Sequence, residues 1–259
     1  MNKLQREVAI THNEPVARDT YALRVHFPEL ASVAEPGQFV TIRVDDTLDP
    51  LLRRPYSISR PMGDECEFLY YVIGKGTKIL ARKKPGDTVN IMGPLGNSFG
   101  VHDDYETAIL VGGGIGVAPF PFLTTRLIDL GKEVVTFLGT RTAKMILEDN
   151  LVNLHVATDD GTVGFHGTVV ACMDAWFNAA SITKPKIFSC GPTPMLAAVQ
   201  SWVREKGIPC ELSLESEMAC GFGICQGCPV EHRDAKRTYA LVCTDGPCFN
   251  AEDITLKRL

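Results

Sequence analysis

The sequence lacks the features that would place it in a membrane or in a nucleic-acid complex. No uninterrupted apolar run approaches the roughly 18 residues that a spanning helix needs. The first residues, MNKLQREVAITHNEP, lack the apolar segment of a secretory signal peptide. The formal net charge is −5, and no stripe of Lys and Arg provides a local basic surface. We therefore expect a cytoplasmic protein that binds neither membrane nor nucleic acid.

Common catalytic patterns are missing as well. The chain contains no H-E-x-x-H, G-x-S-x-G or Walker A pattern, and its six histidines are dispersed. We therefore predict no catalytic residue in the acid–base sense. The composition, with 45% hydrophobic and 22% charged residues, is that of a folded globular protein. A length of 259 residues allows one large domain or two to three small ones.

Cysteine, in contrast, is abundant. Nine cysteines are an odd number, and a reducing cytoplasm does not favour disulfides. Four of them are spaced C-x4-C-x2-C-x14-C: Cys220, Cys225, Cys228 and Cys243. The first three match the plant-type ferredoxin spacing that holds a 2Fe–2S cluster. A zinc site is the alternative, although zinc sites usually contain two C-x2-C pairs and this segment has one.

The chain divides into three predicted parts. Residues 1–101 alternate short β-rich runs with turns, which predicts an antiparallel β-barrel or sandwich with one helix at 76–84. In residues 102–209, continuous apolar strands alternate with amphipathic helices, which predicts an α/β doubly wound parallel sheet. Residues 210–259 are rich in Cys and Gly with little apolar periodicity. We expect this small C-terminal segment to fold around its metal centre.

Polar or glycine-rich turns follow three strands of the predicted parallel sheet. One turn contains Gly112, Gly113, Gly114 and Gly116, the second contains Cys190 and Gly191, and the third begins at Asp159. Such turns lie at the carboxyl ends of strands, where open α/β sheets bind their ligands. A glycine-rich turn before a helix also lets a dinucleotide pyrophosphate approach backbone N–H groups. The first turn lacks the spaced G-x-G-x-x-G pattern, so a purely structural turn stays open.

Two short segments of the first part combine groups that suit a flavin nucleotide. The first, Arg54-Pro55-Tyr56-Ser57, supplies a cation for a pyrophosphate, a flat aromatic ring and a hydroxyl. The second, Gly74-Lys75-Gly76-Thr77, supplies glycine turns at the start of the predicted helix. Neither segment is specific by itself.

Taken in order, these motifs carry a family resemblance. RPYS, GKGT, GGGIGVAPF, TDDG and CGPTPM resemble the ferredoxin-NADP reductase superfamily, which has an FAD-binding barrel followed by a pyridine-nucleotide domain. The later segments ESEMACGFGICQGCPV and YALVCTDGPCFNAEDI are similar to the electron-transfer subunits of class 1B dihydroorotate dehydrogenases. The resemblance covers nearly the whole chain.

The resemblance implies three cofactor sites. FAD would be held by Arg54, Pro55, Tyr56, Ser57, Tyr71, Val72, Ile73, Gly76 and Thr77. NAD(H) would bind at Gly112, Gly113, Gly114 and Gly116 and near Asp159, Cys190 and Gly191. The 2Fe–2S cluster would take Cys220, Cys225, Cys228 and Cys243 as its ligands.

The resemblance also implies a partner. The chain would pass electrons between NAD(H) and an FMN-containing catalytic dihydroorotate dehydrogenase subunit in pyrimidine biosynthesis, as a heterotetramer of two copies of each chain. The alternative is a reductase subunit of another complex, such as a sulfide dehydrogenase, an NADH-ferredoxin transhydrogenase or a hydrogenase. We expect NADH to be preferred over NADPH on the resemblance alone. The residues themselves leave the preference open: Gly139-Thr140-Arg141-Thr142 lacks the acid that binds a ribose 2′-hydroxyl, and Arg141 could favour NADPH.

Overall fold

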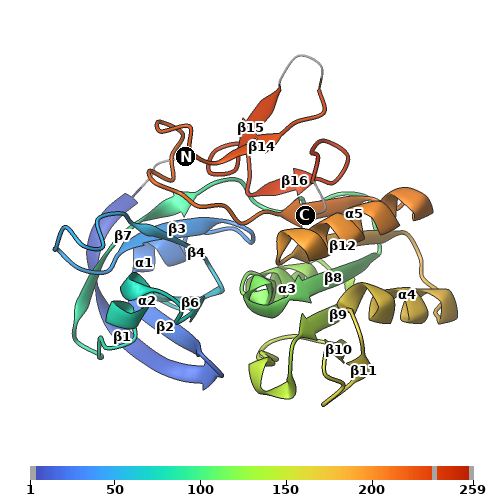
Figure 1. The fold of residues 1–259 in the computed structure, drawn as a ribbon, viewed down its shortest axis with the longest axis horizontal. Helices are drawn as coiled ribbons and strands as arrows, with labels where there is room; N and C mark the ends of the chain where they lie inside the picture. The colour runs from blue at the N-terminus through green and yellow to red at the C-terminus, as the bar shows by residue number, and fades with distance from the viewer. Residues whose placement is uncertain (1–3, 235–237, 257–259) are drawn as a thin grey trace.

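The computed structural model describes residues 4–234 and 238–256. In Figure 1 a β-rich unit and an α/β unit lie side by side, and the C-terminal segment, drawn in orange and red, lies across the top of both. The β-rich unit contains β1 (Leu4–Ala17), β2 (Thr20–His26), α1 (Pro28–Ala31), β3 (Phe39–Arg43), β4 (Arg54–Ser57), β5 (Arg60–Met62), β6 (Glu65–Tyr71), α2 (Lys75–Leu80) and β7 (Thr88–Leu95).

The β-rich unit is one curled antiparallel sheet, which confirms the predicted architecture. Its strand order is β4-β3-β7-β1-β2-β6-β5. Side chains of alternate residues, such as Val40 and Ile42 on β3 and Phe68 and Tyr70 on β6, fill its core. The longest strand, β1, was not predicted. Most of its side chains are exposed, and it is held by pairing with β2 on one side and β7 on the other.

The α/β unit contains the predicted doubly wound sheet. Its elements are β8 (Thr107–Gly113), η1 (Gly114–Val117), α3 (Phe120–Asp129), β9 (Glu133–Thr140), η2 (Ala143–Met145), β10 (Leu154–Thr158), β11 (Phe165–His166), α4 (Val169–Ala179), β12 (Pro185–Cys190) and α5 (Thr193–Lys206). Every residue of β8 is buried, as a central parallel strand requires. Helix α3 packs with Ala108 and Leu110 on one face of the sheet, whereas α4 and α5 pack with Ile109 and Val111 on the other.

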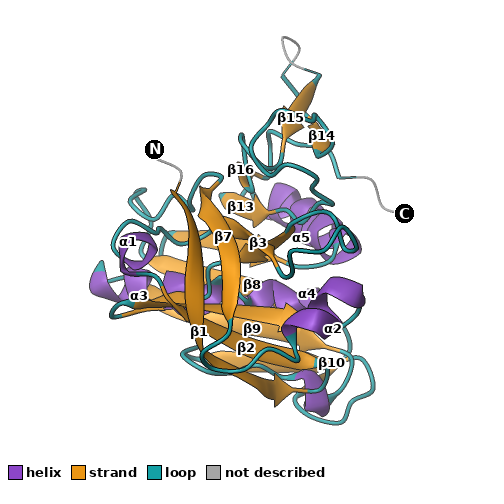
Figure 2. Cartoon of the chain, turned by 90° about the vertical axis from the view of Figure 1, so that its left-hand side faces the viewer, coloured by secondary structure: helices purple, strands orange, loops and turns teal. Residues whose placement is uncertain are grey.

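The C-terminal segment is shared between this sheet and a small lobe. Strands β13 (Cys210–Ser213) and β16 (Cys248–Asn250) extend the sheet in the order β11-β10-β9-β8-β12-β13-β16. Between them, β14 (Pro229–Glu231) and β15 (Tyr239–Leu241) form a hairpin that projects from the body of the molecule (Figure 2). The segment that carries the four cysteines is therefore anchored at both ends by strands of the α/β unit.

None of the helices among the described residues is long and apolar enough to cross a membrane.

Candidate functional site

The four spaced cysteines lie in a loop and a turn that face each other. Cys220, Cys225 and Cys228 belong to the loop before β14, and Cys243 follows β15. The loop has backbone conformations that favour glycine, with φ of +80° at Gly221 and +90° at Gly223. The two parts are joined by the backbone hydrogen bond from Val242 N–H to Cys228 C=O, at 2.9 Å. All nine cysteines, which lie among the described residues, are free thiols.

Backbone N–H groups surround the sulfur atoms. Cys220 Sγ accepts hydrogen bonds from the N–H groups of Phe222 and Cys225, each at 3.5 Å, and Cys228 Sγ accepts one from Cys243 N–H at 3.4 Å. Desolvation opposes ionisation of Cys220, but these N–H groups outweigh it and lower the pKa of Cys220 to about 6. The pKa of Cys243 is raised to about 12 by desolvation and by the neighbouring Cys228. One member of the set therefore ionises readily, and a bound metal would ionise the rest.

The four thiols lie close to one another. The side chain of Cys220 interacts with that of Cys225, and the side chain of Cys243 interacts with that of Cys228 and lies within electrostatic range of Cys220. Across residues 4–234 and 238–256, no three or more His, Cys, Asp or Glu side chains are arranged to hold a single metal ion. Four cysteine thiolates are the donor set of a 2Fe–2S cluster. The donor set and its N–H groups thus fit an iron–sulfur cluster better than a mononuclear zinc ion.

The two segments predicted to bind FAD meet in the structure. A Cβ atom placed on Gly76 would lie 3.2 Å from Nε of Arg54. The guanidinium of Arg54, the first residue of β4, therefore lies against the first turn of α2. The turn itself is closed by Thr77, whose Oγ1 accepts hydrogen bonds from the N–H groups of Ile73 and Gly74 at 3.1 and 3.0 Å. Arg54 is thereby placed beside the turn, as a phosphate-binding pair requires.

The two predicted tyrosines differ in their surroundings. Tyr56 is only 7% exposed and packs edge-on against Tyr70 in the core of the β-rich unit. Its hydroxyl is buried with no hydrogen-bond partner among the described residues, and it lies within electrostatic range of Arg54. Tyr71 ends β6 and reaches the other unit, where a Cβ atom on Gly114 would lie 3.0 Å from its Oη. The unpartnered Tyr56 hydroxyl beside Arg54 is consistent with a polar ligand there.

The glycine-rich loop and the Cys190–Gly191 turn are packed directly against each other. A Cβ atom on Gly116 would lie 2.4 Å from the carbonyl oxygen of Cys190, and one on Gly113 would lie 2.6 Å from Sδ of Met195. These glycines are therefore required by close packing, and Gly114 additionally has φ of +55°. The loop ends at η1, immediately before α3, where it faces Tyr71.

The third predicted turn lies two strands away. Asp159 follows β10, which β9 separates from β8, and Asp159 N–H donates to Thr140 C=O at 3.1 Å. The next residue, Asp160, accepts hydrogen bonds from the N–H and the hydroxyl of Thr162 at 3.0 and 2.6 Å. These contacts lower the pKa of Asp160, the hydroxyl contributing most. The Asp160 carboxylate thus stabilises the turn, whereas Asp159 remains a candidate to bind the nucleotide.

One acidic residue at the junction was missed by the sequence reasoning. Glu215, just after β13, lies within electrostatic range of Tyr71 and of Cys190. Glu215 as a whole is exposed, yet enough protein surrounds its carboxyl for desolvation to raise its pKa. Only the approach of three segments distant in sequence reveals it.

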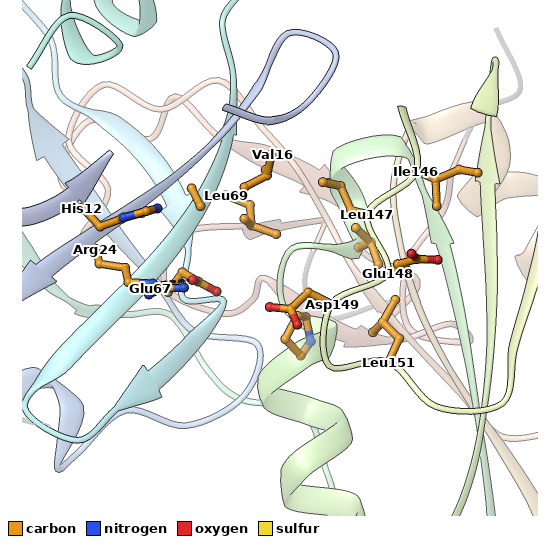
Figure 3. A pocket seen from close by; sticks show the side chains of 13 residues that line it. His12, Val16, Arg24, Glu67, Leu69, Ile146, Leu147, Glu148, Asp149 and Leu151 are labelled. Atoms are coloured by element: carbon orange, nitrogen blue, oxygen red, sulfur yellow. Dashed lines mark hydrogen bonds and ion pairs between the residues drawn. The ribbon is translucent and has the colours of Figure 1, made fainter. Parts of the chain in front are cut away.

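A separate pocket lies between the two units and is shown in Figure 3. It has a volume of about 250 Å³ and is lined by β1, β2 and β6 on one side and by residues 146–151 on the other. Its charged wall contains Glu67, which is paired with Arg24 at 2.8 Å and with Arg60 at 3.0 Å. Arg60 also pairs with Asp149 across the junction. Its lining comes from residues other than the predicted cofactor residues, so we interpret it as a feature of the interface.

Comparison with protein families identifies two regions. Residues 7–99 match the oxidoreductase FAD-binding domain, and residues 215–255 match the iron-sulfur cluster binding domain of dihydroorotate dehydrogenase B. The first region covers the β-rich unit. The second covers all four spaced cysteines.

Several curated proteins are similar over nearly the whole chain. A dihydroorotate dehydrogenase B (NAD(+)) electron transfer subunit from Desulforamulus reducens is 39% identical, covering 90% of this chain and 92% of that protein. The protein of the same name from Bacillus caldolyticus is 38% identical, covering 97% and 99%.

Solved structures share the fold. A structure of NADH-dependent reduced ferredoxin-NADP oxidoreductase has a TM-score of 0.86 and 31% identity, covering 96% of this chain and 90% of that one. The ferredoxin reductase of carbazole 1,9a-dioxygenase has a TM-score of 0.68 at 23% identity, covering 80% and 67%. At that identity the second likeness concerns the fold alone.

Proposed function

Because the chain belongs to the family of dihydroorotate dehydrogenase B electron-transfer subunits, we propose that it carries electrons between NAD(H) and a catalytic FMN-containing dihydroorotate dehydrogenase subunit. The route runs through FAD and a 2Fe–2S cluster. Bound FAD supplies the conversion between the two electrons of a nicotinamide hydride and the single electrons that a cluster accepts. The protein supplies the placement of the three groups.

The observation that carries this proposal is the contact between the three candidate sites. Tyr71 joins the β-rich unit to the glycine-rich loop. Gly221 of the cysteine loop packs against the Thr41 side chain of β3, the strand that pairs with β4. The side chain of Asn97, just after β7, fixes the cysteine-bearing segment through hydrogen bonds with the Cys248 C=O at 2.8 Å and the Asp245 C=O at 3.0 Å. Groups bound at the three sites would therefore lie next to one another in a fixed order.

The proposed role of each residue follows from its chemistry. Arg54 and the turn at Gly76 and Thr77 bind the FAD pyrophosphate, and Pro55, Tyr56, Ser57, Tyr71, Val72 and Ile73 contact the rest of the flavin nucleotide. Gly112, Gly113, Gly114 and Gly116 bring backbone N–H groups to the pyrophosphate of NAD(H), beside Cys190 and Gly191, with Asp159 at its far end. Cys220, Cys225, Cys228 and Cys243 ligate the cluster, and the N–H groups around them stabilise its negative charge.

We further propose a cytoplasmic heterotetramer of two electron-transfer and two catalytic chains. The relatives are named as subunits, which implies a catalytic partner. An electron relay requires its last centre to be near the partner. The exposed Cys225, beside Ile224, whose side chain is 77% exposed, supports docking through the cysteine loop.

Reconstitution tests the proposed function. The isolated chain should contain FAD and about two irons, and should reduce artificial acceptors with NADH but neither oxidise dihydroorotate nor reduce orotate. Addition of the FMN-containing chain should give NAD-dependent dihydroorotate oxidation, and the mixture should sediment as a heterotetramer. Zinc in place of iron, or dihydroorotate turnover by the isolated chain, contradicts the proposal.

A second candidate is a reductase subunit of a ferredoxin-linked complex. The observation in its favour is the likeness to the NADH-dependent reduced ferredoxin-NADP oxidoreductase structure. Reduction of ferredoxin, with no rate enhancement by the FMN-containing chain, would favour this candidate.

The nucleotide preference is measured in the same assays. We expect a higher kcat/KM for NADH than for NADPH. If the preference were reversed, Arg141, which lies within electrostatic range of Tyr71, would be the first residue to examine.

A further inference from the structure

The most exposed large apolar side chains gather beside the predicted phosphate-binding pair of the β-rich unit. Among the described residues, the four most exposed are Leu48 at 83%, Ile73 at 80%, Ile224 at 77% and Leu51 at 65%. Ile224 belongs to the cysteine loop. The other three come from the loop between β3 and β4 and from the turn before α2, which are the two segments that flank Arg54. Such a concentration of exposed apolar surface marks a place where something binds.

The loop at residues 44–53, here called the leucine loop, is held beside the first turn of α2. Asp49 of the loop pairs with Lys75, the first residue of α2. The guanidinium of Arg54 donates a hydrogen bond to the Leu52 C=O. The loop is therefore fixed against the same two elements, β4 and α2, that form the predicted phosphate-binding pair.

The direction of β4 places the leucine loop relative to a bound flavin. The strand runs from Arg54 to Ser57, and Ser57 pairs with Phe39 of β3. A Cβ atom placed on Gly221 of the cysteine loop would lie 4.0 Å from Cε2 of Phe39. The Ser57 end of β4 is therefore the end near the cysteine loop, and the Arg54 end, with the leucine loop behind it, points away from the cysteines.

FAD is a linear molecule in which a pyrophosphate joins a flavin half to an adenosine half. With the pyrophosphate at Arg54, the flavin ring must lie toward Ser57 in order to exchange electrons with the cluster. The adenosine half then lies on the other side of Arg54, where the leucine loop enters β4. Apolar side chains that line a pocket are the usual partners of a flat aromatic ring such as adenine.

We propose that the leucine loop is the adenosine subsite of the FAD site, in which Leu48 and Leu51 pack against the adenine ring. This proposal rests on the proposed function, since it requires FAD. Packing of the ring would remove the apolar surface of both leucines from water. The loop would also make the chain select FAD over FMN, because FMN lacks the adenosine half.

The test is a titration of the full-length chain, from which FAD has been removed, with FAD and with FMN, followed by flavin fluorescence. Wild type should bind FAD more tightly than FMN. The double variant Leu48→Ser with Leu51→Ser should bind FAD about tenfold more weakly and FMN as tightly as wild type does. Both side chains are exposed, so their replacement should leave the fold intact. Leu130→Ser, at an exposed leucine that ends α3, is the matched control and should change neither affinity.

Four outcomes would overturn the proposal. Two of them are equal wild-type affinities for FAD and FMN, and unchanged FAD binding in the double variant. The third is an equal loss for FAD and FMN, which would place the leucines at the flavin half. The fourth is normal FAD binding with lost association with the FMN-containing chain, which would make the loop a docking surface. A wild-type chain that binds neither flavin overturns the proposed function as well, so the two failures are distinguishable.

Discussion

At the scale of single residues, the structure separates side chains that serve the fold from those that are available to a ligand. The hydroxyl of Thr77 closes the turn before α2, and the carboxylate of Asp160 closes the turn after β10. Tyr56 and Thr41, in contrast, have buried hydroxyls without a partner among the described residues. Such a hydroxyl points to a ligand where a charged group lies beside it, as Arg54 does beside Tyr56.

Cys225 tests the cluster assignment directly. Replacing it with serine removes one of four thiolates, so we expect loss of iron and of cluster absorbance, and lower stability of the cysteine-bearing segment, whose own apolar core is small. Iron analysis and the visible spectrum measure the first effect, and limited proteolysis measures the second. Cys172→Ala is the control, since Cys172 lies on α4 away from the set and its loss should leave the iron content unchanged. Full iron content in Cys225→Ser would count against the assignment.

Glu215 gives a prediction about pH. Desolvation raises its pKa in the folded chain above the ordinary value of 4.5, so folding favours the protonated carboxyl. The free energy of unfolding should therefore fall as pH rises from about 4.5 through the folded-state pKa, since the charged form is better solvated in the unfolded chain. Glu215→Gln removes the ionisable carboxyl and with it this fall in the free energy of unfolding. In thermal melts of the cofactor-free chain, the variant should gain stability relative to wild type as pH increases from 4.5 to 8.

Glu217→Gln is the matched control for this pH effect. Glu217 is exposed and lies two residues further along the chain, so its replacement should leave the pH dependence close to that of wild type. Parallel pH profiles for wild type and Glu215→Gln would show that the carboxylate is fully solvated.

At the scale of elements, periodicity predicted most of what the structure contains, and pairing between distant segments accounts for the rest. Continuous apolar runs predicted the strands of the α/β unit, because central parallel strands are buried on both faces. Strand β1 was not predicted, since its side chains are mostly exposed and β2 and β7 hold it. The sequence also could not show that Tyr56 faces the core, or that β13 and β16 extend the sheet, because both depend on contacts distant in sequence.

The same reasoning applies to the candidate sites. Spacing alone predicted the four cysteines as cluster ligands, because their ligand pattern is local. The packing of the Thr41 side chain against Gly221 and the electrostatic proximity of Glu215 to Tyr71 and Cys190 each join segments that are distant in sequence. No local pattern encodes such contacts, so these residues emerged only from the fold.

Gly116 in η1 tests the packing between two elements. Because its Cβ position lies 2.4 Å from the Cys190 carbonyl oxygen and 2.5 Å from the Gly191 Cα, an alanine there must push two backbone turns apart. We expect Gly116→Ala to lower the free energy of unfolding by about 1–3 kcal/mol and to weaken NADH binding. Denaturant unfolding and titration with NADH measure the two effects. Gly74→Ala, at a glycine with open space around its Cβ position, should have a much smaller effect on stability, and equal effects would contradict the packing argument.

At the scale of the whole molecule, a buried ionic network joins the two units where the chain passes from one to the other. Lys186 on β12, whose side chain is 4% exposed, donates to Glu211 on β13 at 2.6 Å and to the Gly100 carbonyl at 2.8 Å, and pairs with Asp103. Glu211 in turn accepts a hydrogen bond from Gly100 N–H at 2.9 Å. The linker after the β-rich unit is thereby held to two strands of the other sheet, which fixes the unit with the candidate FAD site relative to the unit with the candidate NAD(H) site.

Replacing Lys186 should lower the free energy of unfolding far more than replacing Asp103, the exposed acid of this network. In Lys186→Met the carboxylate of Glu211 stays buried without its partner, and we expect the free energy of unfolding to fall by about 3–5 kcal/mol. Asp103→Asn removes a carboxylate whose side chain is 64% exposed, so its effect should stay near 0–1 kcal/mol. The double variant Lys186→Met with Glu211→Gln keeps an acceptor for Gly100 N–H and removes the unpaired charge, so it should recover part of the loss. Denaturant unfolding of all four chains measures these differences. A double variant no more stable than Lys186→Met would mean that the lysine contributes through packing against Tyr105 and Phe188 instead of through its charge.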